Sequence, residues 1–195
     1  MLLNPFKLRD ETQPLVASMT GVKMGDQVAF VGCSHGGRLA AVAAKVGLSG
    51  RAIAVVPDSS SAERASNGAA NAGVLVEVMV APPTALPLDD GGFNLSVVDD
   101  TGGLLGGISA DDRAALAREL LRLLGPGGRV IVIGSTPRSG LGGLFAGASG
   151  VALLTSSGEA KMLLEAAGFK SVRTLAEREG LVFVEGIKPR DRQSG

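Results

Sequence analysis

Short apolar segments that alternate with helix-forming segments are the feature that most limits how this chain can fold. The apolar segments lie at 28–31, 52–56, 74–80, 93–98 and 129–133, and helices are predicted at 37–46, 61–72 and 110–124. The segments at 52–56, 74–80 and 129–133 are almost continuously apolar, which is typical of strands buried on both faces of a parallel sheet. A repeating strand–helix order requires crossover connections. The sequence therefore predicts an α/β fold with a doubly wound, Rossmann-like, mostly parallel sheet.

The C-terminal part of the sequence departs from this repeat. A helix that ends at Ala167 is followed by two predicted strands at 172–175 and 181–185, with a turn near Gly180 between them. This order predicts an antiparallel hairpin that closes the sheet. We expect three parts along the chain: a helix and linker in 1–24, with the helix inside 11–24, one domain over 25–188, and a polar tail at 189–195.

Residues that favour helix ends mark the expected boundaries. The serines at 59–61 can cap the helix over 61–72, and Asp58 is an alternative cap for the same helix. Ser109-x-x-Asp112 resembles a capping box and opens the helix over 110–124, and Ser156 is predicted to cap the last helix. Gly73 is expected to end the helix that precedes it.

Composition excludes several classes of function. Charged residues make up 19% of the chain, the formal net charge is zero, and Trp and Tyr are absent, so we expect no nucleic-acid partner. No apolar run approaches the ~18 residues of a membrane span. The single cysteine, Cys33, excludes an internal disulfide and fits a cytoplasmic protein. No metal-ligand spacing is present, so the expected partners are a small-molecule substrate or a protein, and a homo-oligomer stays open.

The segment after the first predicted strand admits more than one chemistry. Gly32-Cys33-Ser34-His35-Gly36 satisfies the G-x-S-x-G pattern of a nucleophile elbow. A hydrolase triad would need a histidine elsewhere in the chain, and His35 is the only one. The same segment is similar to a dinucleotide-binding G-x-G-x-x-G turn in which Ser34 replaces the second glycine. Short-chain reductases with such a turn also need a tyrosine, which this chain lacks.

A third interpretation rests on four motifs in the expected order. They are Gly25–Val31 followed by Gly32-Cys33, Ala85–Leu95 with its Leu-Pro-Leu-Asp turn, Leu123–Val130 with Pro-Gly-Gly, and Leu163–Phe169. Together they resemble the motifs of class I S-adenosylmethionine-dependent methyltransferases, in the branch that includes the ubiquinone and menaquinone biosynthesis methyltransferases. The resemblance covers about residues 25–188. It implies S-adenosylmethionine as the cofactor, bound at the carboxyl ends of the strands.

The resemblance also implies which residues contact the cofactor. These are Gly32, Cys33, Ser34 and Gly36 in the first turn, Asp58 beyond the second strand, Pro83 beyond the third and Asp99 at the end of the fourth. The family holds the cofactor with three carboxylates, but Phe30, Val56 and Pro82 stand at those positions. Asp58 could take over the ribose contact. No catalytic residue is identified.

The residues of the first turn also have purely structural interpretations. We expect Phe30 to be a core residue, His35 to be solvated or to cap a helix, and Cys33 to serve packing. Two functions stay open on this basis. One is methyl transfer to a small, apolar acceptor, favoured by Leu141, Leu144 and Phe145 in a glycine-rich loop beside the crevice. The other is a non-catalytic methyltransferase-like binding module or partner subunit, favoured by the missing carboxylates.

Overall fold

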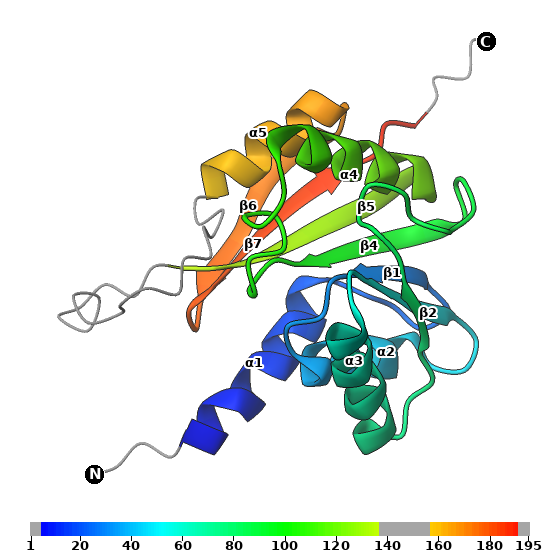
Figure 1. Ribbon diagram of the computed structural model, residues 1–195, viewed down its shortest axis with the longest axis vertical. Coiled ribbons are helices and arrows are strands. Elements are labelled where there is room, and N and C mark those ends of the chain that lie inside the picture. The colour runs from blue at the N-terminus through cyan, green and yellow to red at the C-terminus, as the bar shows by residue number, and fades with distance from the viewer. Residues whose placement is uncertain (1–4, 137–156, 191–195) are drawn as a thin grey trace, which may run out of the picture.

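The computed structural model describes residues 5–136 and 157–190, and this part contains one seven-stranded sheet (Figure 1). The order of its strands is β3-β2-β1-β4-β5-β7-β6. The strands are β1 (Gln27–Val31), β2 (Arg51–Val56), β3 (Glu77–Val80), β4 (Phe93–Asp99), β5 (Leu124–Ser135), β6 (Lys170–Arg178) and β7 (Leu181–Ile187). Strands β1 to β5 are parallel, and β7 runs antiparallel to both β5 and β6. The predicted parallel sheet and the C-terminal hairpin are thus confirmed.

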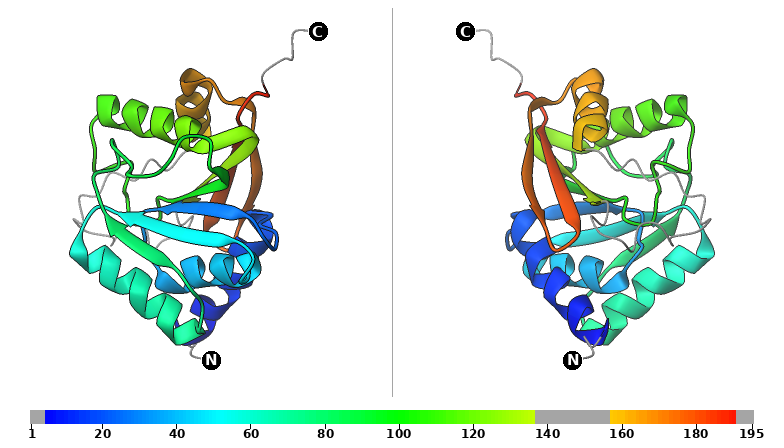
Figure 2. Two further views of the ribbon diagram at one scale, coloured as in Figure 1. Left: turned by 90° about the vertical axis from the view of Figure 1, so that its right-hand side faces the viewer. Right: turned by 90° about the vertical axis from the view of Figure 1, so that its left-hand side faces the viewer.

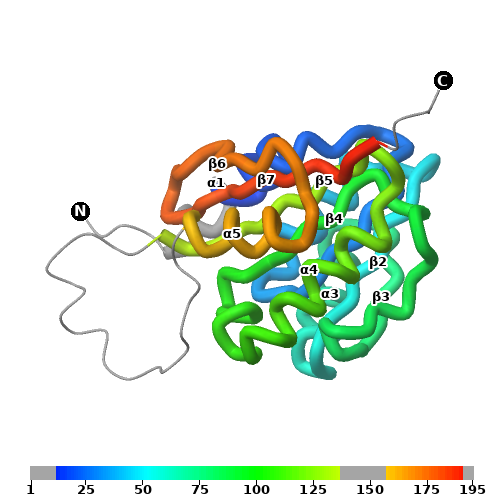
Figure 3. Tube along the Cα trace, turned by 90° about the horizontal axis from the view of Figure 1, so that it is seen from above, coloured from blue at the N-terminus to red at the C-terminus, as the bar shows by residue number. Residues whose placement is uncertain are grey.

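Helices cover both faces of the sheet (Figure 2). They are α1 (Pro5–Met19), α2 (Gly36–Val46), α3 (Ser59–Ala72), α4 (Ala110–Leu123) and α5 (Ser157–Ala167). Helices α1, α2 and α3 lie on one face and α4 and α5 on the other. Figure 3 shows α5 over the β6–β7 side of the sheet and α4 nearer its centre. The sheet is therefore the middle layer of three, as a doubly wound fold requires.

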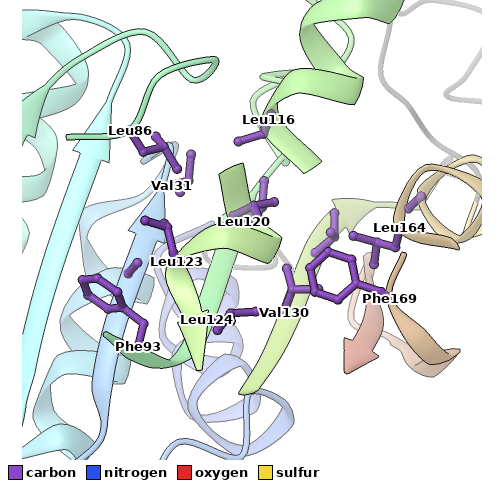
Figure 4. Close-up of a cluster of buried hydrophobic side chains, with 14 of the residues drawn as sticks. Val31, Leu86, Phe93, Leu116, Leu120, Leu123, Leu124, Val130, Leu164 and Phe169 are labelled. Atoms are coloured by element: carbon purple, nitrogen blue, oxygen red, sulfur yellow. The ribbon is translucent and has the colours of Figure 1, made fainter. Parts of the chain in front are cut away.

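Each face of the sheet has its own apolar core. On the α4–α5 face, Leu116, Leu120 and Leu164 are fully buried, and Phe169 packs in the same cluster (Figure 4). On the opposite face, Phe30 of β1 is buried in a cluster with side chains of α1 and α2. Phe30 is thus a core residue, as the sequence predicted.

The strand order places a switch point between β1 and β4. From β1 the chain runs outward to β2 and β3, and it then returns to form β4 on the other side of β1. The loops that follow β1 and β4 consequently leave in opposite directions and open a crevice at the carboxyl ends of these strands. The topology therefore provides the crevice in which the sequence predicted a ligand.

Several helix boundaries differ from the prediction. Helix α1 begins at Pro5, six residues before the predicted helix, and proline is well tolerated at the first position of a helix. Helix α3 begins at Ser59, because Asp58 is its N-cap and accepts a 2.7 Å hydrogen bond from the backbone N–H of Ser61. The prediction that a serine caps α3 was wrong, and the alternative, Asp58, is confirmed. Ser109 caps α4 as predicted, whereas Ser156 lies outside the described residues.

Two strands also differ from the prediction. β3 begins at Glu77 because Val74 belongs to the end of α3, where its N–H donates to the carbonyl of Ala69. β3 also lies at the edge of the sheet and is half exposed, which the apolar run had not indicated. β5 begins at Leu124, directly after α4, and the backbone of Gly127 pairs with Lys188 beyond β7.

Helices α2 and α3 cross at two glycines. A Cβ atom on Gly36 would overlap the carbonyl oxygen of Arg64, and a Cβ atom on Gly68 would overlap the backbone of Gly36. Both glycines therefore permit a backbone-to-backbone approach that no other residue allows. This approach fixes the start of α2, and with it the turn after β1.

Gly68→Ala is expected to destabilise the protein by roughly 1–3 kcal/mol, because the added methyl group overlaps backbone atoms that cannot move without separating the helices. Alanine is otherwise favoured over glycine in a helix by about 1 kcal/mol. The matched control is Gly92→Ala, where the nearest atom lies 3.8 Å from the new Cβ. Urea denaturation measures both variants. A Gly68→Ala variant as stable as the control contradicts the close crossing.

Candidate functional site

A cavity of about 490 Å³ lies at the carboxyl ends of β1, β2 and β4. The first turn contributes Gly32, Cys33 and Ser34, and the segment after β2 contributes Pro57, Asp58, Ser61 and Arg64. Asp99 and the loop after β4 supply the remaining wall, with Gly102, Gly103, Leu104, Gly107 and Ile108. Five of the seven residues predicted to contact the cofactor therefore lie together.

Asp99 joins the two sides of the crevice. Its side chain is fully buried and accepts hydrogen bonds from the backbone N–H of Ser34 at 2.9 Å and from the hydroxyl of Thr101 at 2.6 Å. The guanidinium of Arg38 lies 3.5 Å from the same carboxylate and donates to Thr101. Buried carboxylates require such partners. Asp99 is thus placed at the site as predicted, but its oxygens bind groups of the protein.

Arg38 is the buried cation of this network, and the sequence analysis missed it. The side chain enters from the first turn of α2 and is 9% exposed. Burial lowers the pKa of Arg38, and the neighbouring Asp99 works in the opposite direction. The available signal was a charged residue in the first turn of an alanine-rich helix, far from Lys45 in its last turn. The partner of Arg38 lies 61 positions away in the sequence (99 − 38), and helical periodicity does not reveal such contacts.

Asp58 caps α3 and also lies in the wall of the cavity. Its carboxylate caps α3 through Ser61, and that backbone hydrogen bond is the main cause that lowers the pKa of Asp58. The residue also lines the cavity. Asp58 therefore stays ionised at neutral pH and faces the space in which a ligand would lie. Each carboxylate oxygen accepts more than one hydrogen bond, so capping leaves acceptor capacity free.

Arg64 connects the first turn to the start of α3, and it was also missed. Its Nε donates to the carbonyl of Cys33 at 3.1 Å, and its two terminal nitrogens donate to Ser60 and Ser61 at 2.7 Å. The residue lines the cavity beside Asp58. One cation and one exposed carboxylate thus share this wall.

The thiol of Cys33 is not activated. The residue is 4% exposed, and burial, helped by the nearby Asp99 carboxylate, raises the pKa of Cys33 to about 11. A thiol with this pKa carries almost no thiolate at neutral pH. The packing interpretation of Cys33 therefore holds. His35 is exposed and occupies the N-cap position of α2, where its carbonyl accepts from the N–H of Arg38.

Two predicted contact residues lie elsewhere. Gly36 does not line the cavity, because it is used for the crossing of α2 and α3. Pro83 does not line it either, because the chain after β3 is drawn towards α4. There Arg122 donates to the carbonyls of Leu86 and Leu88 at 2.9 and 2.8 Å. The structure thus gives Gly36 and Pro83 other surroundings than the wall of this cavity, and their contacts with a cofactor stay predictions.

The glycine-rich loop after β4 is held in place by two charged residues. The carboxylate of Asp100 accepts from the N–H of Leu105 at 2.7 Å, and Arg113 donates to the carbonyls of Leu105 and Ile108. Asp100 is 2% exposed, and burial raises the pKa of Asp100 to about 6. The second glycine-rich loop, with Leu141, Leu144 and Phe145, lies outside the described residues.

Comparison with known proteins agrees with the resemblance seen in the sequence. The family model for a methyltransferase domain matches residues 28–128, which is more than half of the chain. The protein therefore belongs to the methyltransferase domain family. No curated protein sequence matches the chain. No helix in residues 5–136 and 157–190 has the length and apolar character that crossing a bilayer requires.

Solved structures share the fold. An S-adenosylmethionine-dependent methyltransferase from Aquifex aeolicus has a TM-score of 0.70 at 20% identity, covering 96% of this chain and 100% of that one. A putative methyltransferase from Bacillus halodurans has a TM-score of 0.68 at 13% identity, covering 92% and 99%. The [4+2]-cyclase SpnF has a TM-score of 0.68 at 19% identity, covering 93% and 81%. Because a cyclase is among them, the fold alone does not determine the reaction.

The Arg38–Asp99 pair is expected to show strong energetic coupling. Arg38→Met leaves a buried carboxylate without its cation and should cost roughly 2–4 kcal/mol, part of which Asp99→Asn in the same chain restores. The control is the exposed pair of Arg51 and Glu77, which is 46% and 51% exposed and should couple by less than about 1 kcal/mol. Urea denaturation of both double-mutant cycles gives the couplings. If the losses in unfolding free energy of the Arg38 and Asp99 single variants simply add in the double variant, the predicted coupling is absent and the prediction is wrong.

Asp100→Asn is expected to stabilise the protein in a pH-dependent way. Because the folded-state pKa of Asp100 lies above 3.8, the folded chain binds a proton that the unfolded chain releases between pH 3.8 and about 6. The stabilisation from protonated Asp100 is therefore lost as pH rises through about 6. The advantage of the variant over wild type should grow over this range, by up to about 3 kcal/mol. Urea denaturation from pH 4 to 8 measures it, and a constant difference contradicts the prediction.

Proposed function

We propose that this protein is an S-adenosylmethionine-dependent methyltransferase that acts on a small, largely apolar acceptor. The observation that carries the proposal is the cavity at the ends of β1, β2 and β4. Its volume of about 490 Å³ falls within the range of ligand pockets, ~300–1,000 Å³. Phe30 is withdrawn into the core on the α1–α3 side, so this large side chain does not fill the crevice.

The residues of the cavity fit an adenosyl group at one point in particular. The ionised carboxylate of Asp58 faces the cavity and keeps acceptor capacity for the paired hydroxyls of a ribose. The turn at Gly32 has a φ of +77°, a conformation suited to glycine. Asp58 thus offers, two positions beyond Val56, the contact that the family places at the end of the second strand.

The chain itself would contribute mainly by positioning the acceptor. The bound cofactor supplies a methyl group attached to a sulfonium. Leu104 and Ile108 give the loop after β4 an apolar wall in the cavity, which supports an apolar acceptor. Cys33 is a neutral thiol and Asp99 is occupied by Ser34 and Thr101, so neither is placed to remove a proton. Alignment of the acceptor with the methyl group is then the main source of rate enhancement.

A second candidate function is a non-catalytic binding module or partner subunit. Its specific support is that the positions at which the family has cofactor-binding carboxylates do not offer a carboxylate to a ligand here. Phe30 and Val56 are both buried in the core, and the buried carboxylate of Asp99 serves the protein's own hydrogen bonds. Asp58 is then the one exposed carboxylate among the described residues that line the cavity. This candidate predicts no binding of the cofactor or its product.

Calorimetric titration with S-adenosylhomocysteine separates the two candidates. The methyltransferase proposal predicts binding below about 1 mM, and Asp58→Ala should weaken it at least about tenfold, because a hydrogen bond to a charged group is lost. Ser109→Ala is the matched control, since it removes the N-cap of α4 outside the cavity and costs a similar ~1 kcal/mol of stability. The control should bind like wild type. Absence of heat at millimolar ligand overturns the methyltransferase proposal in favour of the binding module.

A further inference from the structure

The outer edge of β3 is an unpaired strand edge. In the part of the chain that the structure describes, β3 has β2 as its one neighbour, and Figure 3 shows it at the margin of the sheet opposite β6. The N–H of Ala81 donates to the carbonyl of Val56 on β2 at 3.0 Å. Backbone groups of successive strand residues point to opposite sides. Val78 and Val80 therefore direct their N–H and C=O groups away from β2.

Exposed apolar side chains lie at the amino end of the same edge. Five large apolar side chains are exposed in the described residues, and two of them are Leu48 and Leu75, at 91% and 80%. A third, Val80, is the last residue of β3 and is 58% exposed. Leu48 and Leu75 flank a groove of about 330 Å³ at the amino ends of β2 and β3. Clusters of this kind mark contact surfaces, whereas isolated exposed leucines do not. The groove lies at the opposite end of the strands from the crevice.

Electrostatics permit a second copy of the chain to approach this edge. Glu77 is the one charged residue of β3, and Arg51 on β2 binds its carboxylate at 2.8 Å. The chain has a formal net charge of zero, so two copies do not repel each other over long range. An identical edge therefore offers matching backbone groups and apolar side chains, and the one charge on β3, Glu77, is already paired with Arg51.

We propose that the protein self-associates by antiparallel pairing of β3 with β3 of a second copy. Pairing centred on Val78 places Val76 opposite Val80 of the second copy and Glu77 opposite its Met79. A shift one way sets the two Glu77 side chains directly opposite each other, which is unfavourable. A shift the other way brings Val76 opposite Pro82, which has no N–H. The two sheets then form one continuous sheet, with Leu48 and Leu75 near the contact.

Sedimentation velocity over about 1–100 μM tests the association, a range that suits a small interface. The wild-type mass should rise from that of one chain towards that of two. Leu75 is exposed, so Leu75→Lys should leave the fold intact and raise the dissociation constant of the dimer at least tenfold. Val78→Pro removes an outward N–H that β2 does not use, and should give the same shift. Met162→Lys changes another exposed apolar side chain, on α5, and is the control that should behave like wild type.

Cross-linking tests the register. Glu77 and Met79 of the second copy would form a closely spaced pair suited to a disulfide. A mixture of the Glu77→Cys and Met79→Cys variants should therefore cross-link in much higher yield than Glu77→Cys alone. A wild-type protein that stays monomeric at 100 μM overturns the proposal. A strand from another protein would then be the alternative partner of this edge. Dimers that Leu75→Lys and Val78→Pro leave intact, or that Met162→Lys disrupts equally, overturn it too.

Discussion

The buried carboxylate of Asp99 is the interaction on which the rest of the crevice depends. It stands at the end of β4 and binds the turn after β1, the loop that begins at Thr101, and Arg38 in α2. Because β1 and β4 are neighbours at the switch point of the sheet, one side chain fixes both loops where the topology separates them. A buried charge is costly unless every oxygen has partners, so the network holds a single arrangement.

This use of Asp99 changes how the site can treat a ligand. In the class I pattern, several carboxylates face the cofactor, whereas here Asp99 serves the architecture and Phe30 serves the core. Under the proposed function, recognition would then rest on Asp58, on backbone groups of the first turn and on the apolar loop after β4, which all line the cavity. Asp58 itself also caps α3, which holds its carboxylate in place before any ligand arrives. A fixed acceptor loses less entropy on binding than a free one.

The sequence alone predicted the architecture well and the site only partly. Strand and helix periods depend on local patterns, so the parallel sheet, the hairpin and the cap at Ser109 could be predicted. The edge position of β3 could not, because strand order is not a local property. Arg38 and Arg64 were missed for a similar reason: their partners Thr101 and Cys33 lie 63 and 31 positions away. The role of Gly36 at the crossing of α2 and α3 could not be predicted either, because a glycine pattern does not distinguish a nearby ligand from a crossing helix.

Titration of the ¹⁵N-labelled protein with S-adenosylhomocysteine, followed by amide chemical shifts, tests the central claim most directly. The account predicts that the largest shift changes occur at Gly32–Ser34, Asp58 and Gly102–Gly107, around the crevice that Asp99 holds together. Amides of Leu48 and Leu75, at the opposite end of the strands, should stay unchanged. Shift changes centred on that groove, or no saturable change anywhere at millimolar ligand, would contradict the account.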